Sequence, residues 1–370
     1  GSGDMEVEIA MPQVEEGTTA SSFVENTTGS PKFITGATYG PRVPMILVEP
    51  SATNLVTYSE DFSQSSWIKT GIGTGVAPVV TLNAAESPDG TQNATKVVFD
   101  SGSGITTSDQ SLLEDFFNPT SGTSYTQSIY LKGENGGEKI LLRNAGNNAY
   151  TTITLTTEWA RYEVTETANG STAYFSFGLR QGLGGVVINS KITVYAYGAQ
   201  VEAGSLTSYI PTSGSTVTRA ADDLVISGSD FTDFYNDTEG TVYVEANVLD
   251  NDLITSPHIF EISDGTEDNR IKMHISSSND FIFRPQISGS NVFSRELGSV
   301  GYGSLDRIAL SYETNNYVSS LNGSSDVTDT GAVPSNQTQL VIGGSVQSDP
   351  RNITGRIRRL LFWPYHSDRL

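Results

Sequence analysis

Hydrophobic and polar residues alternate with a period close to two along most of the chain. The alternating runs are short and are broken by Gly, Asn, Asp or Pro; clear examples are residues 151–156, 193–197, 241–247 and 308–312. A period of two places successive side chains on opposite faces of a β-strand. Asp264-Gly265 and Asn322-Gly323 supply the positive φ angles that hairpin turns need. With no amphipathic helical pattern in view, the sequence predicts an all-β fold of sandwiches or barrels.

An internal repeat divides the chain. Residues 13–24 recur as residues 200–210, and each copy follows a strand-like stretch. The second copy closes a long segment that starts near Asn54, whereas the first copy has no such segment before it. We therefore interpret residues 4–24 as the last strand of an upstream repeat. A single strand is marginal alone, so we expect it to pair with another subunit or with the edge of the next domain.

The repeat and the turn signals together predict two consecutive β-sandwich (jelly-roll) domains with a β-strand N-terminal connector. Residues 1–50 form the strand and connector, residues 51–211 the first sandwich, residues 212–238 a linker and residues 239–370 the second sandwich. A chain of 370 residues is long enough for two such domains.

The charge balance excludes several classes of function. The chain has 21 Lys and Arg against 42 Asp and Glu, for a net charge of -21. Such a surface repels phosphate backbones and anionic lipid, so we expect neither nucleic-acid binding nor membrane insertion. No stretch resembles a span of about 20 apolar residues. The absence of cysteine removes disulfides, thiolate metal sites and thiol catalysis together.

The first predicted domain resembles a module found in bacteriophage tail and virion proteins. The resemblance is carried by motifs in a fixed order: residues 54–62 followed by Trp67, then residues 87–91, 125–132, 159–162, 197–212 and 218–222. That module is similar to carbohydrate-binding-module-like jelly rolls, which implies a β-sandwich and suggests glycan recognition.

The second predicted domain resembles concanavalin A-like lectin/glucanase and laminin G-like modules. The matching segments are residues 240–245, 260–265, 307–312, 322–323, 355–357 and 361–364. The pair of domains resembles a phage tail-fibre or virion structural protein. This resemblance implies a location on the virion surface, other virion proteins as partners and a homo-oligomer, for which a trimer is our guess.

Candidate catalytic groups do not assemble into a pattern. Glycoside hydrolysis needs two carboxyl groups on either side of the scissile bond. Glu261, Asp264 and Glu267 are three residues apart and cannot share a strand face. The histidines are far apart in sequence, and none has a ligand partner at metal-binding spacing. We therefore expect no enzymatic activity.

Glycan binding calls for aromatic faces against sugar C–H groups and for planar amide and guanidinium donors to hydroxyls. The candidates in the first domain are Arg143, Asn144, Asn147, Tyr150, Tyr174 and Arg180, and those in the second domain are Arg284 and Tyr302. Alternation places Phe175 and Phe177 on one face and Tyr174 on the other. One set belongs to the core and the other faces a ligand.

Calcium is the metal that best fits the acidic loops, because it takes six to eight oxygen ligands. Glu60, Asp61 and Glu202 are the candidate ligands in the first domain, and Asp222 with Asp223 is a further pair near the junction. The alternative is that these carboxylates are simply exposed in loops.

Three functions remain. The first is a virion protein that binds a bacterial surface polysaccharide without cutting it. The second is a purely structural fibre or decoration module that mediates virion assembly. The third, a polysaccharide depolymerase, lacks a catalytic cluster in the sequence.

Overall fold

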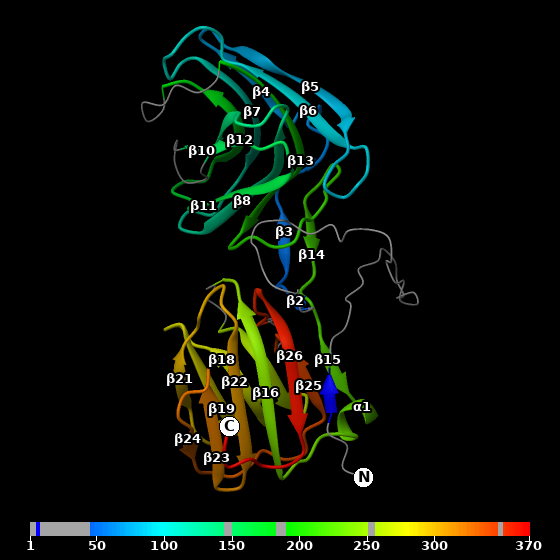
Figure 1. Cartoon of the computed structure of the whole chain (residues 1–370), viewed down its shortest axis with the longest axis vertical. Coiled ribbons are helices and arrows are strands. Elements are labelled where there is room, and N and C mark those ends of the chain that lie inside the picture. Colours follow the sequence, from blue (N-terminus) through cyan, green and yellow to red (C-terminus); the bar gives the residue numbers. More distant parts are fainter. Residues whose placement is uncertain (1–4, 8–44, 144–149, 183–189, 251–255, 347–350) are drawn as a thin grey trace. The chain divides into compact units, whose positions relative to one another are not determined.

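The computed structural model describes residues 5–7, 45–143, 150–182, 190–250, 256–346 and 351–370 (Figure 1). The chain divides into two compact units. We call Ala52–Arg219 the first sandwich, and Ala220–Leu370 with the described strands upstream of Ala52 the second sandwich. Both are built from antiparallel strands, so the predicted all-β fold is confirmed. Among the described residues the one helix is α1 (Ser229–Thr232).

The first sandwich has two five-stranded sheets. One, the β12 sheet, has the order β10 (Tyr150–Thr154), β9 (Lys139–Arg143), β12 (Ala173–Arg180), β7 (Gln110–Phe117), β4 (Ile68–Ile72). The other, the β13 sheet, has the order β11 (Ala160–Thr167), β8 (Ser124–Gly133), β13 (Lys191–Ala203), β6 (Ala94–Asp100), β5 (Val76–Ala85). A ribbon of β3 (Ala52–Asn54) and β14 (Val217–Arg219) joins the two ends of this unit.

Aromatic side chains tie the two sheets of the first sandwich together. Phe177 of β12 meets Phe99 of β6 edge to face, with ring centroids 5.7 Å apart. Trp67 is 1% exposed and packs against Phe175 and Phe62. Phe175 and Phe177 thus belong to the core, which leaves the alternate residues of β12 on the outer face.

Asp115, on the inward side of β7, is a buried carboxylate whose pKa burial raises to about 6. A raised folded pKa means that the protonated form is favoured in the fold, so stability is lost as pH rises from about 4 to about 6. We expect wild type to lose about 2 kcal/mol over this window relative to Asp115→Asn, by urea denaturation at each pH. Parallel pH profiles of the two proteins would contradict this.

The second sandwich also has two sheets. The β16 sheet has the order β26 (Gly355–Trp363), β16 (Glu239–Val248), β22 (Asp306–Glu313), β23 (Asn316–Leu321), β24 (Val327–Asp329). The β17 sheet has the order β15 (Val225–Ser227), β25 (Gln339–Ile342), β17 (His258–Ser263), β18 (Arg270–Ile275), β19 (Asp280–Ile287), and β20 (Ser290–Asn291) and β21 (Arg295–Ser299) both pair with β19. Phe283 and Tyr317 meet across the shared core, 5.9 Å apart.

Two short strands from upstream of Ala52 complete the β16 sheet. β1 (Met5–Val7) and β2 (Ile46–Val48) both pair antiparallel with β26. Part of the stretch predicted as a connector is therefore an edge of the second sandwich. Likewise β15 and α1, in the stretch predicted as a linker, belong to this unit.

Candidate functional site

The outer face of the β12 sheet brings four of the predicted glycan-binding residues together. Arg143 lies directly opposite Tyr150 in the pairing of β9 with β10. Its guanidinium is 5.9 Å from the Tyr150 ring centroid and 5.0 Å from that of Tyr174. The Arg180 guanidinium also lies over the Tyr150 ring, 5.5 Å from its centroid. We call these four residues the Arg143 cluster; Asn144 and Asn147 lie outside the described residues.

Two further residues of β7 belong to this face, and the sequence reasoning missed both. Glu114 Oε1 is 3.7 Å from Arg143 Nη1, and Glu114 Oε2 accepts a hydrogen bond of 2.7 Å from Thr70. Phe116 is opposite Tyr174 in the register and meets its ring at 5.8 Å, while remaining 44% exposed. The alternation of β7 was the available signal, because residues 114 and 116 share one face of that strand.

An apolar edge borders the polar centre. Ile68 and Ile72 of β4 are both about half exposed. They pair with Glu114 and Gln110 respectively, which places them on the outer face beside Thr70. Ile68 and Ile72 thus add exposed apolar surface to the border of the polar cluster.

The side chains of this face can bind a ligand through hydrogen bonds and ring contacts. Arginine and tyrosine supply hydrogen-bond donors at fixed angles, and the ring faces accept C–H groups. Glu114 is the carboxylate beside the Arg143 cluster, and it is already engaged by Arg143 and Thr70. A glycosidase of the common type uses two carboxyl groups, whereas Glu114 is the one carboxylate that we identify on the described part of this face.

Arg284 and Tyr302, the two predicted glycan-binding residues of the second sandwich, lie in different surroundings. Arg284 is on the outer face of β19, where its Nε and Nη2 donate to Ser294 Oγ at 3.2 and 3.1 Å. Tyr302 follows β21, packs against the core and donates to Asn279 Oδ1 at 2.5 Å. Burial raises the pKa of the Tyr302 hydroxyl. Arg284 is therefore available to a ligand, whereas Tyr302 mainly anchors a loop.

The predicted calcium ligands of the first sandwich accept hydrogen bonds from the protein. Glu202 is fully buried and accepts from Thr207 N at 2.9 Å and Gln200 Nε2 at 2.7 Å. Asp61 accepts from Ser63 and Gln64 within its own turn, and Glu60 from Tyr209 at 2.9 Å. In the described part of the chain no three acidic or histidine side chains are grouped to hold a metal. Calcium binding by these residues stays a prediction.

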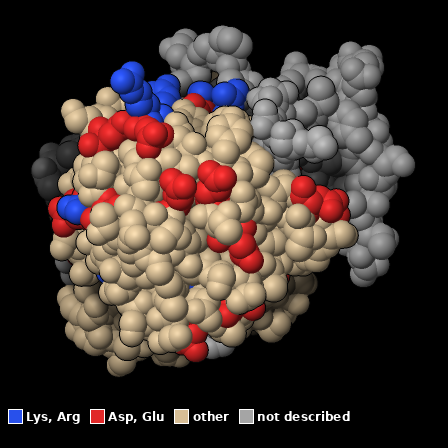
Figure 2. Space-filling model, turned by 90° about the horizontal axis from the view of Figure 1, so that it is seen from below, with Lys and Arg blue, Asp and Glu red and all other residues tan. Residues whose placement is uncertain are grey.

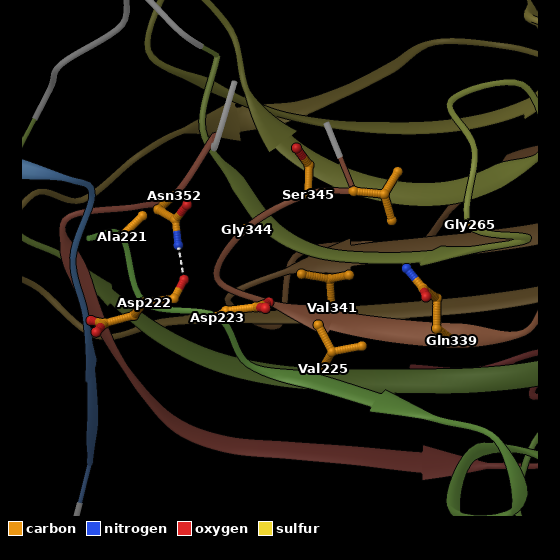
Figure 3. Close-up of a pocket in the computed structure, with 11 residues that line it drawn as sticks. Ala221, Asp222, Asp223, Val225, Gly265, Gln339, Val341, Gly344, Ser345 and Asn352 are labelled. Carbon is orange, nitrogen blue, oxygen red and sulfur yellow. Dashed lines mark hydrogen bonds between the residues drawn. The ribbon is translucent and has the colours of Figure 1, made fainter. Parts of the chain in front are cut away.

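A hollow of about 450 Å³ lies in the second sandwich beside β15 and β25 (Figure 3). Asp222 and Asp223 line it together with Gln339, Ser345 and Asn352, and none of its eleven lining residues is basic. Asn352 Nδ2 donates to the Asp222 carbonyl at 2.6 Å, and Glu49 N donates to the Asp222 carboxylate. The hollow is thus polar and acidic.

Acidic side chains dominate the charged surface. Figure 2 shows Asp and Glu scattered over one face among uncharged residues, with the basic side chains gathered mainly near one edge. This pattern fits the net charge of -21. Within the described residues, no helix has the length and apolar character that crossing a membrane requires.

Asp264, considered above as an acid of a glucanase-like set, belongs to a turn. It accepts from Thr266 N at 2.9 Å and from Asn269 Nδ2 at 2.8 Å, and Gly265 follows with a φ of 90°. The predicted hairpin between β17 and β18 is therefore present.

Comparison with known proteins gives likenesses of fold only. No protein-family model matches the chain, and no curated protein matches it. Among solved structures, the carbohydrate-binding module (CBM40) of the Ruminococcus gnavus IT-sialidase, bound to α2,3-sialyllactose, has a TM-score of 0.32 and 13% identity, and the match covers 40% of this chain and 92% of that one. A structure described as "CBM4 structure and function" has a TM-score of 0.24 and 18% identity, with 34% and 86% covered.

The NanB sialidase of Streptococcus pneumoniae has a TM-score of 0.32 and 13% identity, with 39% of this chain covered. The match spans only 25% of the length of that sialidase. Likenesses at these TM-scores carry no argument about what this chain binds, so its function must be argued from its own residues.

Proposed function

We propose that the chain is a non-catalytic glycan-binding protein and that the Arg143 cluster, with Phe116, forms the sugar-contact surface. The observation that carries the proposal is the position of the Arg143 guanidinium between the rings of Tyr150 and Tyr174. Side chains held in this way lose little freedom when a ligand binds, which favours affinity.

The kinds of group on this face suit the surface of a sugar. A pyranose ring has apolar C–H patches and a rim of hydroxyl groups. Phe116 and the two tyrosines offer ring faces, whereas Arg143 and Arg180 offer donors and Glu114 an acceptor. Each aromatic contact contributes about 0.5–1.5 kcal/mol beyond area burial. Three such contacts contribute about 1.5–4.5 kcal/mol, and the upper end of this range corresponds to a dissociation constant of about 1 mM.

The ligand that we propose is a bacterial surface polysaccharide, and the setting is the surface of a phage particle. Support comes from the ordered motifs of the first sandwich, which resemble those of phage tail and virion proteins. In this setting the partners are other virion proteins, and a trimer is the proposed assembly. Calcium is proposed as a structural ion at the loop carboxylates, to be tested by binding with and without chelator.

A second candidate function is purely architectural, and one observation favours it. β2 pairs with β26 through residues Ile46, Leu47 and Val48, so a segment upstream of the first sandwich adds a strand to the second. Strand addition at a sheet edge is also a way in which separate chains associate. In this alternative the sandwiches space or decorate a fibre without touching sugar.

The test is binding of the chain to a panel of bacterial surface polysaccharides, compared with Tyr150→Ala. Loss of the ring that both Arg143 and Arg180 approach is expected to weaken binding about tenfold, or roughly 1.4 kcal/mol, by calorimetry. The matched control is Tyr195→Ala, because Tyr195 makes a similar contact with Lys132, at 5.4 Å, on the β13 sheet.

Tyr195→Ala should bind as wild type does, and the polysaccharide should keep its length. Equal weakening by both variants would overturn the assignment of the face. Binding to no member of the panel at millimolar concentration would favour the architectural function, and shortening of the polymer would favour a depolymerase.

A further inference from the structure

The outer face of the β17 sheet carries a row of charged residues on three adjacent strands. Glu261 of β17 is opposite Lys272 of β18, and Lys272 is opposite Arg284 of β19. Directly opposed residues of neighbouring strands place their side chains on the same face. The next row is Ser263, Arg270 and Gln286. Basic residues thus concentrate here in a chain whose net charge is -21.

Glu261, the acidic residue of this row, forms an ion pair with Arg270 of the next row. Arg270 Nη1 donates to Glu261 Oε2 at 3.0 Å, and its Nε donates to Gln286 Oε1 at 2.5 Å. Glu261 Oε1 accepts from Val346 N at 3.3 Å, so Val346, which follows β25, lies against Glu261 on this face. Arg270 thus has a direct carboxylate partner in Glu261, whereas Glu261 acts on Lys272 through its charge alone.

Lys272 has no comparable partner. Its side chain is 3% exposed, and no hydrogen bond to its ammonium is found among the described residues. Burial, reinforced by the positive charge of Arg270, lowers the pKa of Lys272 to about 7. Across the strand, Arg284 contacts the uncharged Ser294 hydroxyl, and burial with the charge of Arg270 lowers its pKa too. Two like charges directly opposed across strands destabilise a sheet.

The two neighbouring histidines, His258 and His274, do not provide a negative charge that could balance Lys272. Burial lowers the pKa of His258 to about 4 and that of His274 to about 2, so both rings are neutral near pH 7. His258 Nδ1 lies 3.1 Å from Glu261 Oε2. His258 Nε2 and His274 Nδ1 are buried without a hydrogen-bond partner within the described structure. Arg351, the remaining charged group that acts on Lys272, is also basic.

A buried lysine without a hydrogen-bond partner is a candidate ligand-binding group, because a bound anion would supply the partner that its charge lacks. A carboxylate fits here, since its two oxygens accept from an ammonium and a guanidinium at once. Arg284 is half-buried on β19, and β17 and β18 separate β19 from β25 and β15, the strands beside the acidic hollow, so Arg284 offers the approach.

We propose that Lys272 and Arg284 form a binding site for a carboxylate, supplied by an acidic sugar residue of a polysaccharide. The proposal adds a second site on the other sandwich and does not depend on the Arg143 cluster. The same chemistry would accept a free carboxylate such as acetate, so the experiment must separate these two sources.

The experiment is thermal unfolding of the full chain with glucuronate, glucose or acetate at matched ionic strength. We expect glucuronate to raise the melting temperature of the second sandwich and to bind with at least tenfold higher affinity than glucose. Arg284→Gln should reduce this affinity at least tenfold, and its half-buried position makes it compatible with folding. Lys272→Met should abolish the effect and raise the melting temperature of the unliganded chain.

The matched control is Arg307→Gln, since Arg307 is exposed on the β16 sheet beside Glu245. It should respond to glucuronate as wild type does. If acetate raised the melting temperature as much as glucuronate does, the carboxylate site would stand, but the proposal that an acidic sugar supplies the carboxylate would be wrong. The site itself would be overturned by equal protection from glucose, or by a full glucuronate response in Arg284→Gln. Tyr150→Ala leaves the site of Lys272 and Arg284 intact. If Tyr150→Ala did not weaken polysaccharide binding, that result would therefore count against the Arg143 cluster alone.

Discussion

Glu261→Gln is expected to lower the free energy of unfolding of the second sandwich by about 3–5 kcal/mol, the usual effect of removing one partner of a buried ion pair. Glu261 is 0% exposed and is the carboxylate that Arg270 contacts at 3.0 Å. A neutral amide would leave Arg270 and Lys272 buried together without a negative charge between them. Urea denaturation gives the free energy, and hydrogen exchange at β17 and β18 assigns the loss to the second sandwich.

Glu267→Gln is the matched control for this prediction. Glu267 approaches the same guanidinium at 3.5 Å, but its side chain is 51% exposed. Exposed ion pairs contribute about 0–1 kcal/mol, so the control should be nearly as stable as wild type. A cost below about 1 kcal/mol for Glu261→Gln would mean that the basic residues do not depend on Glu261, and the charge excess argued for this face would then be wrong.

Asn54→Ala is expected to cost the first sandwich about 3–5 kcal/mol, since several buried backbone groups would lose their partners at about 1–3 kcal/mol each. Asn54 Nδ2 donates to the carbonyls of Ala199 and Ile210, at 3.1 and 2.8 Å. Asn54 Oδ1 accepts from the amides of Val56 and Val201, both at 3.1 Å. One buried side chain thus joins the first and last segments of this unit. Urea denaturation measures the cost.

Thr53→Ala is the neighbouring control. Thr53 Oγ1 bonds Thr218 Oγ1 at an exposed position of the same ribbon, so its removal should cost less than about 1 kcal/mol. If Asn54→Ala proved as mild as Thr53→Ala, the four hydrogen bonds of Asn54 would not be what closes the sandwich.

Much of the fold could be predicted from local pattern. Alternation placed Phe175 and Phe177 on one face of their strand and Tyr174 on the other face. The structure puts the two phenylalanines in the core. Asn54 opens the motif on which the resemblance of the first domain rests, and its hydrogen bonds explain why an asparagine stands there. Turn chemistry likewise indicated the hairpin at Asp264-Gly265, because it depends only on adjacent residues.

Features that depend on pairing between distant strands could not be predicted. Arg270, Lys272 and His274 alternate visibly along one strand, but their register against Arg284 is set by the fold. Glu261 was considered only as a catalytic acid, since the sequence does not reveal that Arg270 contacts it. In the same way, the apolar run that contains Ile46–Val48 gave no sign that its partner is β26.

The most direct test of the central claim is NMR mapping of a polysaccharide fragment that binds the chain, with arginine and tyrosine labelled. We expect the signals of Arg143, Tyr150 and Tyr174 to shift together and to saturate with the same dissociation constant. Saturable shifts confined to Tyr130 and Tyr195 on the β13 sheet, with the Arg143 cluster unmoved, would contradict it.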